Sequence, residues 1–359
     1  MAERGDPFET RNQTINTAFY LPKTICQFCL DPDQKKIVEI QNHNFNNWKS
    51  LIFFLEIHRL QPLFFKGMMR FPGSSIPTEF LTDLEVKYQS VSKYNGVYFE
   101  ILDEVRGLFK SKIEFILLKG CDLILRIYED KALRPLDDID ILIRAKDLSR
   151  AHFLLSKIGF VEIGTPDEKR HHRVLSRRSY ARVHPGLNSP FFVEIHWDLR
   201  WMLHHYHTDG AWENFFLLPY QGGLIKGLDQ CDLFLYLSLH WLNHWRDKDR
   251  LLWAVDLAFL IKKGLVPWET IRDKARENHL FFAFHAVLRR LSYFFDLDVL
   301  GVPENLLREN AKFFDARILR FASKYPTFLS LLTCNSAPPD WHEVLNGMRR
   351  VLQRRVKQR

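Results

Sequence analysis

The sequence has few cysteines and lacks the long apolar runs of a membrane protein. Five cysteines in 359 residues are too few for a disulfide framework, which excludes the small disulfide-stabilised secreted class. No stretch approaches the ~18 consecutive apolar residues of a transmembrane helix, and Asp256 interrupts the apolar run 251–261. The N-terminal sequence has no apolar run typical of a signal peptide. We therefore expect a soluble, cytoplasmic protein with no membrane partner.

The composition is that of an ordinary globular chain. Hydrophobic residues make up 46% and charged residues 26%, which excludes a disordered or fibrous chain, and the length suggests about two domains. The net charge is +8, because 51 basic residues outnumber 43 acidic ones. Part of this excess lies in a basic tail, 335–359, which is more typical of a frayed helix end than of a binding arm. The charge is therefore only weak support for an RNA partner.

The spacing of apolar residues divides the chain into regions of different character. Neither an internal repeat nor a low-complexity segment is present. Helical spacing dominates on both sides of a stretch with short, strand-like runs, which predicts an α+β core between helices. The predicted regions are an irregular N-terminal segment (1–45), an N-terminal helical region (46–110), the α+β core (111–205), a helical domain (225–330) and the basic tail (335–359).

Within the predicted core, short apolar or alternating runs indicate strands and longer periodic runs indicate helices. A turn at Lys119-Gly120 separates the first strand from the first helix. Polar residues 171–182 are expected to be extended. The predicted strands are 115–118, 138–143, 160–163 and 191–197, and the predicted helices of the core are 121–128 and 146–158.

The pair Asp138 and Asp140 is the central chemical feature of the sequence. Both lie in an alternating, β-branched run, and residues i and i+2 of a strand share a face. The aspartates therefore point one way while Ile139, Ile141 and Ile143 point into a core. Two adjacent carboxylates repel each other unless a cation lies between them. A strand start with solvated acids would explain an isolated pair equally well.

A second predicted strand adds a third carboxylate. Glu194 shares a face with Phe192 and His196 in an otherwise apolar run, and a lone acid in such a strand needs a partner. If the two strands are neighbours, Asp138, Asp140 and Glu194 converge. Oxygen ligands favour a hard cation such as Mg²⁺. Two such ions ~4 Å apart commonly activate a hydroxyl and stabilise a leaving pyrophosphate.

Positive groups near these acids are candidates for binding phosphate. Gly120 lets the backbone approach a ligand at a strand-to-helix junction, the helix offers free N–H groups, and Lys119 adds a charge. Arg134 precedes the first aspartate by four residues and could bind a phosphate through two hydrogen bonds. A surface lysine and an ion pair between Arg134 and Asp137 are the structural alternatives.

These residues together resemble the nucleotidyltransferase superfamily typified by DNA polymerase β, and more narrowly its bacterial family of uncharacterised nucleotidyltransferases. The similarity covers most of residues 45–300, and its specificity lies in the combination of spaced motifs. The core motifs are Leu117-Leu-Lys-Gly120, Arg134-Pro-Leu-Asp-Asp-Ile-Asp-Ile-Leu142 and Val193-Glu-Ile-His-Trp197. The flanking motifs are Trp48…His58-Arg-Leu-Gln-Pro62, His240-Trp-Leu-Asn-His244 and Trp253-Ala-Val-Asp256.

The resemblance implies a fold, a cofactor and a reaction. The fold is α+β, a small mixed β-sheet core flanked by N-terminal helices and a C-terminal helical domain. Asp138, Asp140 and Glu194 would carry Mg²⁺, or Mn²⁺ in its place, and the enzyme would transfer NMP from an NTP. The turn in the wider superfamily is usually Gly-Gly or Gly-Ser, and the gap between the turn and the acidic pair is shorter. Lys119 could replace the missing phosphate donor.

Histidines outside the acidic motifs are candidates for an acceptor pocket. His240 and His244 are one helical turn apart and share a face, and Asp256 lies on the next predicted helix. These three could line a substrate pocket or form a metal site, although helix packing explains them as well. His172 and His196 could flank the active site or be structural.

A CxxC pair stands apart from the motifs above. Cys26 and Cys29 have no second pair, and His43 is the nearest further metal ligand in the sequence. A zinc or redox role is one interpretation, and burial as ordinary apolar residues is the other.

The sequence thus predicts a Mg²⁺-dependent transfer of NMP to a hydroxyl of a small molecule, a protein or an RNA. Glu194 could instead act as a general base. Replacing Asp138 or Asp140 by Asn is expected to abolish transfer with little loss of fold, because the carboxylate repulsion is relieved. Two alternatives stay open: a non-catalytic nucleotide- or RNA-binding protein on the same fold, and a toxin-like transferase acting on tRNA ends. Salt-dependent RNA binding would favour the latter.

Overall fold

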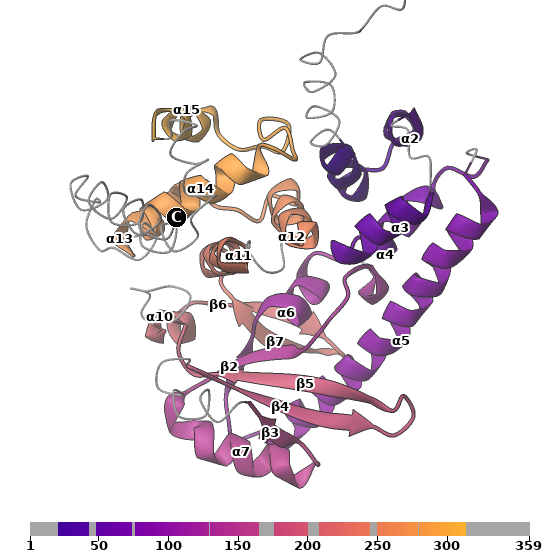
Figure 1. The fold of residues 1–359 in the computed structure, drawn as a ribbon. Helices are drawn as coiled ribbons and strands as arrows, with labels where there is room; N and C mark the ends of the chain where they lie inside the picture. The colour runs from indigo at the N-terminus through magenta and orange to yellow at the C-terminus, as the bar shows by residue number, and fades with distance from the viewer. Residues whose placement is uncertain are drawn as a thin grey trace, which may run out of the picture.

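The computed structural model contains a mixed seven-stranded sheet, which lies in the lower half of the view in Figure 1. The structure describes residues 21–42, 48–73, 76–128, 130–164, 176–199, 208–244, 250–278 and 280–313. The order of the strands in the sheet is β3-β4-β5-β2-β1-β7-β6. Their bounds are β1 Phe115–Leu117, β2 Ile139–Ile143, β3 Val161–Ile163, β4 Arg177–His184, β5 Ser189–His196, β6 Phe215–Tyr220 and β7 Gly223–Leu228.

Helices precede, interrupt and follow the strands. Residues 21–30 are helical, and two short 3₁₀ turns, Lys131–Leu133 and Ala145–Asp147, flank β2. None of the described helices is long and apolar enough to cross a membrane. The α-helices are α2 Gln34–Asn42, α3 Trp48–Ile57, α4 Gln61–Met68, α5 Thr78–Phe109, α6 Lys119–Arg126, α7 Leu148–Lys157, α10 Asp209–Glu213, α11 Gln230–His244, α12 Leu251–Lys262, α13 Trp268–Glu277, α14 Phe281–Leu291 and α15 Glu304–Phe313.

Strand β2 lies between β1 and β5 and is buried along its whole length. It runs antiparallel to β1 and parallel to β5. Ile139, Ile141 and Ile143 pack with the long helix α5 and with α7 in one hydrophobic cluster, as their alternation predicts. The opposite face of β2 carries Asp140 and Leu142, and Leu142 belongs to a second cluster. The acidic face of β2 therefore meets a different set of helices from the isoleucine face.

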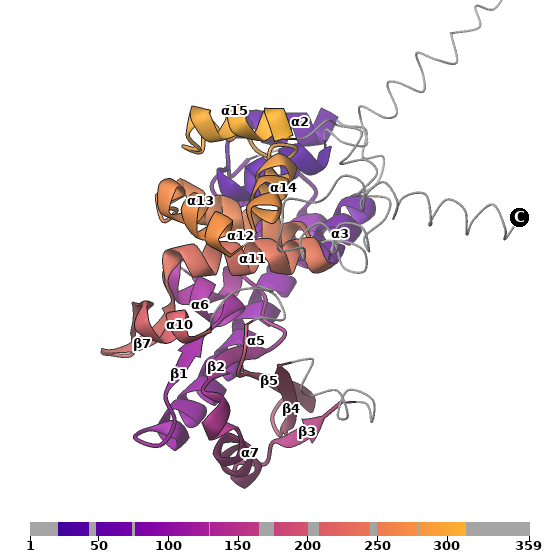
Figure 2. The same cartoon turned by 90° about the vertical axis from the view of Figure 1, so that its left-hand side faces the viewer.

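The second cluster joins helices from both ends of the described chain. Residues of α2, α3, α4 and the start of α5 pack with residues of α11 to α15 in one continuous core. Figure 2 shows these helices gathered at one end of the molecule, with the sheet and α7 at the other. The sequence predicted an N-terminal helical region and a C-terminal helical domain, and the structure packs the two against each other.

Two parts of the fold differ from the sequence-based expectation. Residues 21–30 and 34–42 are helical, where an irregular segment was predicted; the buried faces of these helices are too short to show a clear periodicity. The hairpin of β6 and β7 extends the sheet beyond residue 205, the end of the predicted core. Gln221 and Gly222 form its turn, and the largely apolar strands around them have no strict alternation. The overall α+β class with a mixed sheet is confirmed.

Candidate active site

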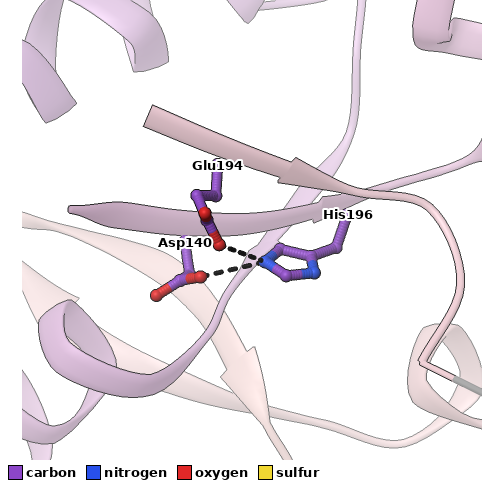
Figure 3. Close-up of side chains that lie close together, drawn as sticks. All are labelled: Asp140, Glu194 and His196. Atoms are coloured by element: carbon purple, nitrogen blue, oxygen red, sulfur yellow. Dashed lines mark hydrogen bonds and ion pairs between the residues drawn. The ribbon is translucent and has the colours of Figure 1, made fainter. Parts of the chain in front are cut away.

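Strands β2 and β5 bring an aspartate, a glutamate and a histidine together on one face of the sheet (Figure 3). The parallel register pairs Asp140 with Glu194 and Leu142 with His196, so the expectation that the two acidic strands are neighbours is confirmed. Alternate residues of a strand share a face, which places His196 on the side of Glu194. The side chains of Asp140, His196 and Glu194 are 1%, 5% and 14% exposed.

A lysine ammonium lies inside this group of side chains. Nζ of Lys119 is 2.6 Å from Oδ1 of Asp140 and 4.0 Å from Oε2 of Glu194. Nε2 of His196 is 2.9 Å from the same Oδ1 and 3.6 Å from the same Oε2. Lys119 was predicted to face a phosphate. In this structure its charge offsets that of Asp140 and part of that of Glu194, which also pairs with Arg177. The two carboxylates could not be buried together without such cations.

Strand β4 supplies two further partners that the sequence did not reveal. The register pairs Ser179 with Glu194, and the Ser179 hydroxyl donates to Oε1 of Glu194 at 3.0 Å. The guanidinium of Arg177 donates to Oε2 at 3.2 Å. The polar segment around 171–182 gave no reason to prefer these two residues, because only the strand pairing shows which of them faces Glu194.

Asp138 lies one residue before β2 and is half-buried. The hydroxyl of Tyr98 donates to the backbone carbonyl of Asp137 and so fixes the chain just ahead of it. Among the described residues, the side chains whose ligand atoms all lie within 4.8 Å of one another are Asp140, Glu194 and His196. The predicted carboxylate trio differs from this group in having Asp138 where the structure has His196, so a metal-binding role for Asp138 stays a prediction.

Burial and charge divide the three carboxylates into two kinds. Burial opposes ionisation of Asp140, but the ammonium of Lys119 and the bond to His196 hold the pKa of Asp140 below its usual value. Burial also acts on Glu194, whose pKa is held well below the usual range by His196 and Lys119. Burial and the neighbouring charge of Asp140 raise the pKa of Asp138 well above normal. Two acids are thus ionised around Lys119, and the third resists ionisation.

The turn from β1 into helix α6 holds Lys119 in place. Lys119 has φ 45°, in the left-handed region that residues other than glycine rarely adopt. A Cβ on the next residue, Gly120, would lie 2.5 Å from a methyl of Leu136 and 2.8 Å from a guanidinium nitrogen of Arg134. Only glycine therefore fits between helix α6 and the segment that leads into β2. Helix α6 has no side-chain cap at its N-terminus, which leaves backbone N–H groups available for an anion.

Arg134 is held by Asp256 rather than by the alternative partner Asp137. Its guanidinium donates to both carboxylate oxygens, with Nη2 2.9 Å from Oδ2, and the hydroxyl of Tyr128 donates to Oδ1 at 2.6 Å. Asp256 is 1% exposed. This buried group ties helix α12 to the start of β2. The predicted phosphate-binding role of Arg134 and the pocket role of Asp256 stay predictions. In the fold, their ion pair connects the two segments.

Helix α11 covers the polar face of the sheet with three more polar side chains. The rings of His240 and His244 are 4.6 Å apart, and both pack against Trp253. Burial, followed by the charge of Lys119, lowers the pKa of His240 well below normal, which keeps it neutral. Tyr236, one turn earlier, is 1% exposed, and its hydroxyl has no hydrogen-bond partner among the described residues. Tyr236 carries no functional signal in the sequence, because an aromatic residue at helical spacing is usually part of a core.

The group of Asp140, Glu194 and His196 fits a divalent cation. Two carboxylates suit Mg²⁺ and Mn²⁺, and an imidazole nitrogen is a ligand for transition metals. The ligand atoms are close enough to share one ion, and the ammonium of Lys119 already shows that a positive charge is stable there. The donor set is compatible with the predicted Mg²⁺ and with Mn²⁺.

Some predicted residues fall elsewhere. His172, His43 and the basic tail lie outside the described residues. Cys26 and Cys29 are buried in the helix of residues 21–30 and form no disulfide with a described residue. Burial raises the pKa of the Cys29 thiol above its usual value. This environment favours the apolar interpretation of the pair, because a reactive or metal-binding cysteine has a lowered pKa.

Comparison with known proteins gives one family and one solved structure. A family model described as "Uncharacterised nucleotidyltransferase" matches residues 44–296. No curated protein matches the chain. A crystal structure of an antigenic nucleotidyltransferase-like protein from Paracoccidioides brasiliensis is 17% identical to this chain, with a TM-score of 0.30. The match covers 49% of this chain and 75% of that protein.

Proposed function

The chain belongs to the uncharacterised nucleotidyltransferase family, and from that premise we propose that it transfers NMP from an NTP to a hydroxyl group of an acceptor. The observation that carries the proposal is the convergence of Asp140, Glu194 and His196 beside the start of helix α6. An NTP carries about four negative charges, and charge moves to the leaving pyrophosphate during transfer. A buried cluster that binds cations beside free helix N–H groups has the charge pattern that such a reaction needs.

We assign a divalent cation, Mg²⁺ or Mn²⁺, to Asp140, Glu194 and His196, with Asp138 as a further carboxylate. When bound, the cation would lower the pKa of the acceptor hydroxyl and offset the charge of the leaving pyrophosphate. Glu194 serves better as a ligand than as a general base. Its pKa is held well below normal by His196 and Lys119 against the effect of burial, and an efficient base has a pKa near the working pH.

Lys119 and the N-terminus of α6 would bind the phosphates. The ammonium of Lys119 already lies among Asp140, Glu194 and His196, so a triphosphate entering beside α6 would give it a further anionic partner. The left-handed conformation of Lys119 directs its side chain toward β2 while its backbone begins the helix. Gly120 keeps Arg134 close to the same turn, and the ion pair with Asp256 holds its guanidinium there.

Label transfer from NTP tests the proposal. The purified protein is incubated with each of the four NTPs carrying an α-phosphate label, with Mg²⁺ and with cell extract as the source of acceptor. The double variant Asp138→Asn/Asp140→Asn is assayed beside it. The variant Asp83→Asn, which makes the same chemical change on an exposed position of α5, is the matched control. We expect transfer by the wild type and by the control, and none by the double variant.

The labelled product identifies the acceptor class, since small molecules, proteins and RNA separate by size. NTP binding without transfer in every extract would contradict the proposal and leave a nucleotide-binding role. Equal transfer by the wild type and the double variant would also contradict it, because the carboxylates would then carry no part of the reaction.

A further inference from the structure

A cavity of about 470 Å³ lies at the start of β2 and β5. Helix α5, the turn between α3 and α4, the segment leading into β2 and the start of β5 form its walls. Asp137 lines it and immediately precedes Asp138. Phe192 lines it as well and lies two residues before Glu194, on the same face of β5. The cavity therefore lies beside the residues proposed to carry out the transfer.

The cavity also reaches the start of helix α6. Leu136 lines the cavity, and a Cβ on Gly120 of α6 would lie 2.5 Å from its methyl group. Phosphates bound beside α6, as in the proposed function, would therefore lie close to this cavity.

We propose that this cavity binds the acceptor, and that the acceptor is a small hydroxylated molecule bearing an anionic group, either a phosphate or a carboxylate. The inference rests on the proposed function. The volume of the cavity is within the usual range of binding sites for small molecules.

The guanidinium of Arg59, which lines the cavity, and that of Arg250, which contacts the lining residue Asp137, mark the place for the anionic group. Arg59 and Arg250 both donate to the same oxygen, Oδ2, of Asp137, the latter at 2.7 Å. The side chains of Arg59 and Arg250 are 20% and 23% exposed, and that of Asp137 is 53% exposed. Asp137 neutralises only one of these two positive charges, and the other charged lining residues, Glu56 and Lys87, offset each other. An anion entering the cavity can therefore pair with the remaining charge, and arginine binds phosphate and carboxylate through paired hydrogen bonds.

The backbone at Arg59 supports a role for its side chain. Arg59 has φ 59° at the end of helix α3, where the N–H of Leu60 bonds to the carbonyl of Leu55 at 2.8 Å. Glycine is the usual residue at such a left-handed helix end. Strained residues of other types persist where the side chain is needed. Here the side chain of Arg59 is needed because its guanidinium bonds to Asp137 at the edge of the cavity.

The other walls suit a hydroxylated molecule. Tyr94 and Phe192 are half-buried rings on two sides of the cavity, and such rings pack against the flat faces of sugars and bases. Gln61, Lys87 and Ser90 also line it, and within the described part of the chain their side chains make no hydrogen bond or ion pair. These groups can donate to or accept from the hydroxyls of a ligand.

Titration calorimetry with defined probes tests the inference without any transfer reaction. The probes are ribose 5-phosphate for the phosphate class, gluconate for the carboxylate class and ribose as the neutral reference. The variants are Arg59→Gly, which removes the guanidinium and suits the left-handed backbone, and Asp137→Asn, which removes the competing carboxylate. The control is Ser111→Gly, which makes a matched change at another exposed residue with positive φ, 61°.

At least one anionic probe should bind the wild type more tightly than ribose does. Arg59→Gly should weaken that binding about tenfold, as expected for the loss of one charge-assisted hydrogen bond. Asp137→Asn should strengthen it, and Ser111→Gly should leave it unchanged. A purely structural role for the Arg59–Asp137 pair would not move the two variants in opposite directions.

No binding of either anionic probe, or equal binding by the wild type and Arg59→Gly, would overturn the inference. Such a result is distinguishable from failure of the proposed function, because label transfer by the wild type is measured separately. If the wild type transfers label but Arg59→Gly binds the probes like the wild type, the proposed activity stands and the acceptor does not bind in this cavity.

Discussion

The ammonium nitrogen of Lys119 lies 2.6 Å from Oδ1 of Asp140, and both side chains are almost fully buried. The pair changes the expected behaviour of the acidic residues. The sequence alone suggested that replacing Asp140 by Asn relieves repulsion between carboxylates and spares the fold. The structure shows that Asp140 is instead the main partner of a buried cation. The two partners depend on each other for their charge.

The variant Asp140→Asn is therefore expected to lose stability as well as activity. Removing one partner of a buried ion pair typically costs about 3–5 kcal/mol, and we expect the lower part of this range because Glu194 stays 4.0 Å from the ammonium of Lys119. Urea unfolding at neutral pH should show this loss, while the exposed control Asp83→Asn should stay within about 0.5 kcal/mol of the wild type. Wild-type stability of Asp140→Asn would mean that Lys119 finds another partner at no cost.

Lys119 is expected to compete with a divalent cation for the carboxylates. Replacing it with Gln removes a unit charge from within 4.0 Å of Asp140 and Glu194. Binding of Mn²⁺, followed by electron paramagnetic resonance of the free ion, should then become about tenfold tighter or more. Lys119→Arg keeps the charge and should bind Mn²⁺ like the wild type. If Lys119→Gln and Lys119→Arg bound Mn²⁺ equally, the ammonium would not occupy the cation site.

Gly120→Ala is expected to destabilise the protein. The new methyl group would lie 2.5 Å from Leu136 and 2.8 Å from Arg134, and overpacking of this kind costs about 1–3 kcal/mol. Gly107→Ala provides a matched control, because Gly107 lies in helix α5 and a Cβ there meets nothing within 4 Å. Thermal unfolding should show a loss for the first variant and a gain of up to about 1 kcal/mol for the second. Equal effects would show that the turn is free to adjust.

A second buried acid gives a pH dependence that is separate from the active site. Asp232 forms an ion pair with Lys274, which also contacts Asp229 at 3.2 Å. Burial, and then the hydrogen bond with Asp229, raises the pKa of Asp232 from 3.8 to about 7. Between pH 3.8 and about pH 7, Asp232 of the folded protein holds a proton that it has lost in the unfolded chain. The free energy of unfolding therefore falls as pH rises through this window, by up to about 1.4 kcal/mol per pH unit.

The variant Asp232→Asn should lack this dependence, because an amide does not titrate. Denaturant unfolding of the wild type and the variant at several pH values between 4 and 8 measures the difference. The stability of the variant relative to the wild type should increase with pH across the window and level off above it. Parallel curves would show that Asp232 is ionised throughout.

The core of the site could be predicted from the sequence because its residues lie on strands. Period-two spacing placed Asp140 and Glu194 on polar faces, and the structure pairs them across β2 and β5. The same spacing put His196 beside Glu194, but no pattern indicated that it reaches Asp140. Arg134 and Asp256 are 122 residues apart, and their contact depends on the packing of helix α12 against the start of β2.

Long-range packing also explains the features of the fold that sequence patterns left out. Among the described residues, one pair, Leu117 of β1 with Gly227 of β7, joins the β6–β7 hairpin to the rest of the sheet. Gly227 has no room for a side chain, since a Cβ there would lie 2.1 Å from a carboxylate oxygen of Asp122. A glycine chosen for close packing looks the same in a sequence as one chosen for a turn. The hairpin therefore had no recognisable strand signal of its own.

We propose above that Asp140, Glu194 and His196 carry out nucleotidyl transfer, and the fate of a labelled phosphate decides whether they do. One NTP is labelled at the α-phosphate in one reaction and at the γ-phosphate in another, with Mg²⁺ and an acceptor extract. We expect the α label to enter the acceptor and the γ label to leave as pyrophosphate, and both events to be lost in Glu194→Gln. Transfer of the γ label to the acceptor, or unchanged transfer by Glu194→Gln, would show that the reaction or its site is a different one.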